Sequence, residues 1–86
     1  MAVDIAERVM QVIAKTQHID VASFSPDSTF EEMKIDSLDG INIVFAVENE
    51  FGIDVPDDAM KALRSVRDVI NGVEKLLAEK AAEPTA

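Results

Sequence analysis

The chain has 86 residues and no cysteine, so it has room for one domain with one core, and it can form neither a disulfide framework nor a thiolate metal site. Hydrophobic residues make up 48% of the chain, which excludes simple disorder, and no apolar run approaches the ~18 residues that a membrane span needs. The formal charge of −9 repels phosphate backbones, so nucleic acid is not an expected partner.

One helical domain is expected over residues 1–80. The small, proline-broken stretch at 81–86 is expected to be a flexible C-terminal tail. The first residues lack the basic and apolar segments of a signal peptide, which favours a cytoplasmic location.

The first helix is expected over residues 5–16, where apolar side chains recur at helical spacing and Asp4 is suited to cap the first turn. The next stretch is rich in Ser, Pro and Asp, residues that favour turns, so it predicts a long first loop. A long loop in a small domain needs anchoring. The apolar residues expected to pin it to the core are Ile19, Phe24, Phe30 and Met33.

The second helix is expected over residues 37–51, with Asp36 at its N-cap and Gly52 at its end. On a helical wheel one apolar stripe has the width of a core-facing stripe. Its members are Gly40, Ile43, Val44, Val47 and Phe51.

A second apolar stripe, formed by Leu38, Ile41 and Phe45, lies on roughly the opposite face of this helix. Either the helix is packed on both sides, or the stripe docks partners. The second interpretation is favoured, because so small a chain has few elements left to cover both faces.

Two more helices are expected. Pro56 is suited to the first turn of a short third helix, and Ser65 with Asp68 forms a capping box ahead of a fourth helix that runs to Lys80. No stretch alternates apolar and polar residues as a strand does. The predicted fold class is therefore all-α, a small four-helix bundle of three longer helices and one short one.

Acidic residues are concentrated in one part of the chain. Residues 35–60 contain seven Asp or Glu and no Lys or Arg, giving −7, whereas the remaining ten acidic and eight basic residues give −2. Acids interleaved with exposed apolar side chains fit a surface offered to basic partners.

Two linked motifs resemble those of the acyl carrier protein family. Ile35-Asp36-Ser37-Leu38-Asp39 stands at a helix start, and Glu48-Asn49-Glu50-Phe51-Gly52-Ile53-Asp54-Val55-Pro56-Asp57 covers the helix end and the residues after it. The resemblance covers about residues 3–78. It implies a discrete carrier, not an enzyme, with a 4′-phosphopantetheine joined to Ser37 through a phosphodiester and acyl groups held on its thiol as thioesters. A serine at a helix N-terminus suits such a phosphate, because free backbone N–H groups and the positive dipole end face it.

The resemblance also implies partners: a phosphopantetheinyl transferase, and acyl-handling enzymes of fatty-acid, lipid or polyketide synthesis with basic docking patches. The carrier is expected to be a monomer and to hold no metal. The expected partner-binding residues are Asp36, Leu38, Asp39, Ile41, Phe45 and Glu48.

Some positions depart from the family's pattern. Lys34 stands where the family usually has glycine, and a left-handed backbone there would cost roughly 1 kcal/mol. Gly40 costs a helix about 1 kcal/mol relative to alanine. It either widens the entrance for an acyl chain or permits a close helix contact. Asn42 and Asn49 stand where members of the fatty-acid type often carry acids.

Other classes of protein fit less well. A serine hydrolase needs a base near its serine, but His18 is the one histidine of the chain and no Gly-x-Ser-x-Gly elbow is present. Asp54, Asp57 and Asp58 lack the order of a calcium loop. An acidic helical adaptor without a prosthetic group explains the charge and the second stripe, but it gives no reason for Asp-Ser-Leu at a helix start. The acyl group and the pathway stay open.

Overall fold

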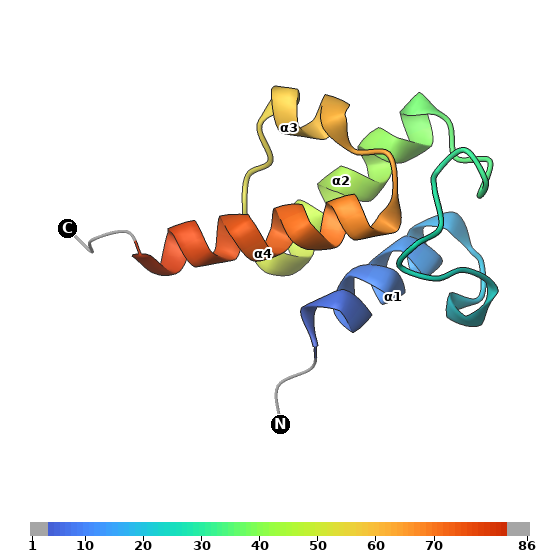
Figure 1. Cartoon of the computed structure of the whole chain (residues 1–86), viewed down its shortest axis with the longest axis horizontal. Helices are drawn as coiled ribbons and strands as arrows, with labels where there is room; N and C mark the ends of the chain where they lie inside the picture. The colour runs from blue at the N-terminus through green and yellow to red at the C-terminus, as the bar shows by residue number, and fades with distance from the viewer. Residues whose placement is uncertain (1–3, 83–86) are drawn as a thin grey trace.

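The computed structural model describes residues 4–82. Within this range the chain forms an all-helical bundle (Figure 1), as the sequence predicts. An isolated bridge joins Thr29 to Ser65, and the described range contains no strand. The elements in chain order are α1 (Ile5–Gln17), the 3-10 turn η1 (Val21–Ser23), α2 (Ser37–Phe51), α3 (Asp57–Ala62) and α4 (Val66–Ala82).

α1 lies against both α2 and α4 and closes one side of the bundle (Figure 1). The carboxylate of Asp4 accepts a hydrogen bond from the N–H of Ala6, which confirms the predicted cap. The helix ends one residue beyond the predicted range, at Gln17, where His18 adopts a left-handed conformation with φ of 57°.

The core lies between α1, α2 and α4. Burying these branched aliphatic side chains is the main favourable term that holds the helices together. The fully packed cluster consists of Val9, Ile13, Ile43, Val47, Phe51, Ile53, Val66, Val69, Ile70 and Val73.

The long first loop is pinned at three of the four predicted residues. Phe24, Phe30 and Met33 pack against the core cluster. The prediction for Ile19 is wrong: its side chain is 37% exposed, because the chain turns at His18 and carries residue 19 away from the core.

Backbone hydrogen bonds also tie this loop to the start of α4, an attachment that the sequence does not predict. The N–H of Val66 donates to the carbonyl of Ser28 at 3.0 Å, and the N–H of Arg67 donates to that of Pro26 at 2.8 Å. The guanidinium of Arg67 adds an ion pair with Asp27 at 2.9 Å. Satisfying the first N–H groups of α4 in this way fixes the loop beside the helix.

α2 has the predicted bounds, and Gly52 ends it in a left-handed conformation with φ of 65°. α3 begins at Asp57, so Pro56 occupies the N-cap and not the predicted first turn. In Ser65 and Asp68, each side chain accepts a hydrogen bond from the backbone N–H of the other residue, at 3.3 and 3.2 Å, which confirms the capping box of α4.

α4 continues through Ala82 and so includes the first two residues of the expected tail. The rest of that tail, residues 83–86, lies outside the described residues. Over residues 4–82, no helix combines the length and the apolar character needed to cross a membrane.

Candidate functional site

Ser37 is the first residue of α2 and its side chain is exposed. The carboxylate of Asp36 caps this end of the helix by accepting a hydrogen bond from the N–H of Asp39 at 2.9 Å. The N–H groups of Ser37 and Leu38 have no hydrogen-bond acceptor among residues 4–82. An oxyanion attached to Ser37 would therefore meet two free donors and the positive end of the helix dipole.

The turn that leads into this helix holds Lys34 in the left-handed conformation, with φ of 59°. The N–H of Lys34 donates to the carbonyl of Glu31 at 3.1 Å, and that of Ile35 donates to Phe30 at 2.9 Å. These two bonds close the turn around a residue that is not glycine. The turn before Ser37 thus has a left-handed residue even though that residue is lysine. The side chain of Lys34 costs roughly 1 kcal/mol of stability in this conformation.

A cavity of about 710 Å³ opens beside Ser37, between the first loop, α2 and α3. Its lining is mixed: apolar side chains from three elements, and charged ones from the loop, α2 and the α3 region. Among the lining residues are Phe30, Glu31, Asp36, Ser37, Gly40, Val44, Asp57, Lys61, Leu63 and Arg64. A serine that shares a cavity with apolar side chains can place an attached chain inside it.

A smaller cavity of about 170 Å³ lies between α2, α3 and α4. Val44 and Leu63 line both cavities and separate them. An apolar chain that enters beside Ser37 and reaches these two side chains would therefore be next to a second, largely apolar space.

Gly40 lines the larger cavity, one turn beyond Ser37. A Cβ atom built at Gly40 would have no heavy atom within 4 Å outside its own helix turn. The interpretation of Gly40 as a close helix contact is therefore wrong. The other interpretation, a wider entrance to the cavity, agrees with the open space.

Gly40→Ala is expected to raise the free energy of unfolding of the apo protein by up to about 1 kcal/mol, because alanine favours the helix and meets no obstacle. It is also expected to weaken the protection of long acyl thioesters, because the methyl group takes part of the entrance. Urea denaturation and thioester hydrolysis rates measure the two effects. A destabilised apo variant would contradict the open geometry.

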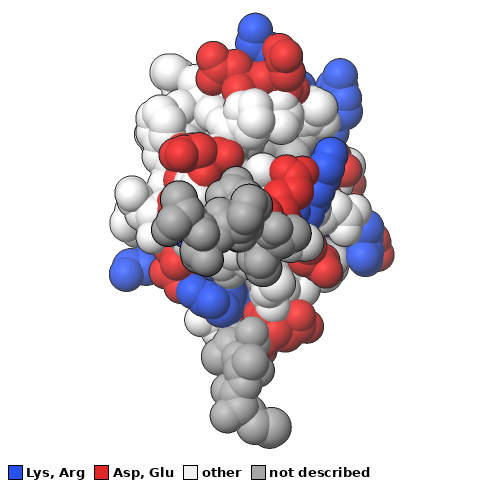
Figure 2. Space-filling model, turned by 90° about the vertical axis from the view of Figure 1, so that its left-hand side faces the viewer, with Lys and Arg blue, Asp and Glu red and all other residues white. Residues whose placement is uncertain are grey.

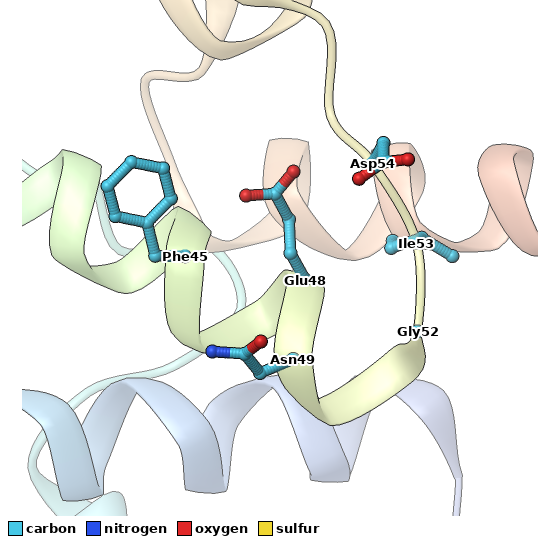
Figure 3. A pocket seen from close by; sticks show the side chains of 6 residues that line it. All are labelled: Phe45, Glu48, Asn49, Gly52, Ile53 and Asp54. Carbon is cyan, nitrogen blue, oxygen red and sulfur yellow. The ribbon is translucent and has the colours of Figure 1, made fainter.

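The second apolar stripe of α2 faces outward. Leu38 is 72% exposed, Ile41 37% and Phe45 53%. Packing of α2 on both sides is therefore excluded for the isolated chain. Beside Phe45 lies a shallow hollow of about 350 Å³ that Glu48 and Asn49 of α2 and Ile53 and Asp54 of the α2–α3 loop complete (Figure 3).

Glu48 has a structural role that the sequence does not reveal. Its Oε2 accepts the N–H of Val55 at 2.8 Å, and the side chain is half-buried. The contact holds the loop after Gly52 against the end of α2. Its carboxylate nevertheless stands between Phe45 and Asp54 at the rim of the hollow (Figure 3), so the same group also contributes charge there.

The acidic excess of residues 35–60 is only partly neutralised by the rest of the chain. Glu50 pairs with Arg8 of α1 at 2.9 Å, while the Arg8 guanidinium lies 4.4 Å from the centre of the Phe51 ring. Asp39 is half-buried in the first turn of α2.

Acting differently from the acidic segment 35–60, the end of the molecule that faces left in Figure 1 carries acidic and basic side chains interspersed (Figure 2).

Comparison with known proteins agrees with this geometry. The family model described as phosphopantetheine attachment site matches residues 7–73. The acyl carrier protein of Rickettsia typhi is 38% identical over 72 residues, which span 83% of this chain and 84% of that one. That of Sinorhizobium fredii is 37% identical over 73 residues, spanning 84% and 94%. The crystal structure of the Thermotoga maritima acyl carrier protein superposes with a TM-score of 0.77 at 28% identity, covering 86% and 87%.

Proposed function

Because the chain belongs to the acyl carrier protein family and contains its phosphopantetheine attachment domain, we propose that Ser37 is the residue to which the arm is joined. The observation that carries this assignment is the position of Ser37. It is exposed, it stands at the N-terminus of α2 beside two free N–H groups, and it opens onto a cavity. When bound, the arm supplies a thiol that holds acyl groups as thioesters.

The residues around Ser37 have separate roles in this proposal. Asp36 fixes the first turn by capping Asp39, so the serine hydroxyl is presented at a defined position. The N–H groups of Ser37 and Leu38 stabilise the phosphodiester charge. The cavity beside Gly40 and Val44 shelters the proximal part of an acyl chain from water. The chain itself catalyses no reaction, in keeping with its family.

Incubation with CoA, Mg²⁺ and a promiscuous phosphopantetheinyl transferase is expected to add one arm of about 340 Da, as a phosphodiester to serine. Intact-mass spectrometry measures the addition. Ser37→Ala is expected to abolish it, whereas Ser23→Ala, which removes an exposed serine of η1, is expected to leave it complete. Labelling that persists in Ser37→Ala would refute the assignment.

We further infer that the transferase and the acyl-handling enzymes dock on the outer face of α2. Two features support this surface. The stripe of Leu38, Ile41 and Phe45 is exposed, and the hollow beside Phe45 is rimmed by the carboxylates of Glu48 and Asp54 (Figure 3). An apolar side chain of a partner enzyme, with a Lys or Arg of that enzyme beside it, would fit both the stripe and the acidic hollow. Asp36 and Asp39 lie at the Ser37 end of the same helix and extend the negative field toward the arm.

A carrier of this kind works by moving its cargo between enzymes, so we propose that the protein acts as a cytoplasmic monomer. In a monomer the docking face of α2 is free for one enzyme at a time. The proposal draws on the exposed stripe and on the similarity to bacterial acyl carrier proteins.

A further inference from the structure

The cavity beside Ser37 has two basic side chains in its lining. Lys61 lies in the last turn of α3, and Arg64 comes two residues after that helix ends. Both are exposed, and neither forms an ion pair with any side chain in the range 4–82. Asp57 stands four residues before Lys61, a spacing at which an acid and a lysine can pair on a helix, yet no ion pair joins them. The two bases are therefore available to a group that enters the cavity.

Arg64 is held at the cavity through its backbone. Its N–H donates to the carboxylate of Asp68 at 2.9 Å, and its carbonyl accepts from the N–H of Phe30 at 2.9 Å. The guanidinium, in contrast, has no hydrogen-bond partner among residues 4–82. The fold thus fixes the base of this side chain and leaves its five N–H donors unused by the described chain.

α3 is weakly anchored. None of its six residues is buried, and Pro56 at its N-cap forms no side-chain hydrogen bond. The helices α1, α2 and α4, in contrast, each bury several side chains in the core. A group that contacts the start of α2 and the two bases at once would tie the α3 region to the rest of the bundle.

The first group of the proposed arm is an anion at this place. Its phosphorus is bonded to the oxygen of Ser37, so the phosphodiester lies beside the free N–H groups at the start of α2 wherever the rest of the arm points. Among the residues that line the cavity, Lys61 and Arg64 carry the charge that attracts it, and a guanidinium matches two phosphate oxygens. Their attraction also offsets the repulsion from the acids of the same lining, Glu31, Asp36 and Asp57.

We propose that Arg64 and Lys61 bind the phosphodiester of the arm, so that the arm joins the N-terminus of α2 to the α3 region across the mouth of the cavity. The two bases are positioning residues, because they hold the first group of the arm and take no part in the chemistry of its thiol. This inference rests on the proposed attachment to Ser37. It adds that the apo protein and the holo protein, which carries the arm, differ in how firmly α3 is held.

The test measures the coupling between the arm and the bases. Melting temperatures are compared for the apo and holo forms of the unmodified protein and of the double variant Lys61→Gln with Arg64→Gln, and intact mass confirms one arm in each holo form. Loading is expected to change the melting temperature of the unmodified protein more favourably than that of the double variant, by at least about 2 °C, because the variant lacks two exposed ion pairs. Added salt is expected to shrink this difference.

Two further measurements locate the contact. The amide hydrogens of residues 57–62 are expected to exchange at least about 2-fold more slowly in the holo form than in the apo form, and the double variant is expected to lose this protection. The phosphorus NMR resonance of the holo protein is expected to move when both bases are replaced. A melting difference without that movement would place the bases on the amides of the arm and would overturn the inference.

Lys15→Gln combined with Lys75→Gln is the matched control, since it removes the same charge from two exposed lysines that do not line this cavity. It is expected to retain the melting difference and the position of the phosphorus resonance. An equal effect of loading in the unmodified protein and in the cavity double variant, or an equal loss in both double variants, would overturn the inference. An arm that loads on Ser37→Ala would instead refute the attachment, so the two failures are distinguishable.

Discussion

Replacing Phe45 with alanine is expected to leave the free energy of unfolding of the apo protein nearly unchanged, whereas Ile43→Ala is expected to lower it by about 2–5 kcal/mol. The two residues lie two positions apart on α2. Ile43 is fully buried in the core, and its truncation leaves a cavity, while Phe45 is 53% exposed and leaves none. Urea denaturation of both variants measures the contrast. A loss above about 3 kcal/mol in Phe45→Ala would show that the ring belongs to the core.

The same Phe45→Ala variant is expected to dissociate faster from a basic partner such as the transferase. Complete burial of the ring would contribute about 1.5–3 kcal/mol, which corresponds to roughly 10–150-fold in the dissociation rate. Because this contact is short-ranged, the effect is expected at every salt concentration. Surface plasmon resonance with immobilised transferase gives the rates. Dissociation as slow as that of the unmodified protein would place the docking surface elsewhere.

Replacing Glu48 with alanine is expected to lower the free energy of unfolding by about 1–3 kcal/mol, because the N–H of Val55 then loses its acceptor in a partly buried position. Glu48→Gln is the matched control, since its amide oxygen can still accept that hydrogen bond. We expect it to remain within about 1 kcal/mol of the unmodified protein. Equal destabilisation by Ala and Gln would show that the loop after α2 is not held by this bond.

Glu48→Gln also separates charge from structure in partner binding. Steering by exposed charges is screened over about 8 Å at physiological salt, so the loss of one acid is expected to slow association and to leave dissociation nearly unchanged. Added salt is expected to shrink the difference. Stopped-flow association with the transferase measures it, and a salt-independent deficit would point to a contact role for the Glu48 carboxylate.

Much of α2 could be predicted because its signals are local. Asp36 caps a donor three residues away, and Gly52 accepts the left-handed conformation that ends the helix. The outward stripe arises from the same 3.6-residue period that places Ile43 in the core. The left-handed backbone at Lys34 is likewise local, because it is a property of the turn before the helix.

Contacts between distant segments were decided by the tertiary structure. The carboxylate of Asp27 contacts the guanidinium of Arg67, forty residues later in the chain. The N–H of Val55 donates to the carboxylate of Glu48, seven residues earlier and on the other side of the end of α2. No spacing rule links such pairs, because their approach depends on how the helices pack. The outward turn of Ile19 and the open space at Gly40 have the same origin. The sequence thus determined the helices and the position of Ser37 at a helix start, because both depend on residues that are near neighbours in the chain. Only packing decided the cavity and the charges around it, because these depend on which surfaces meet in space.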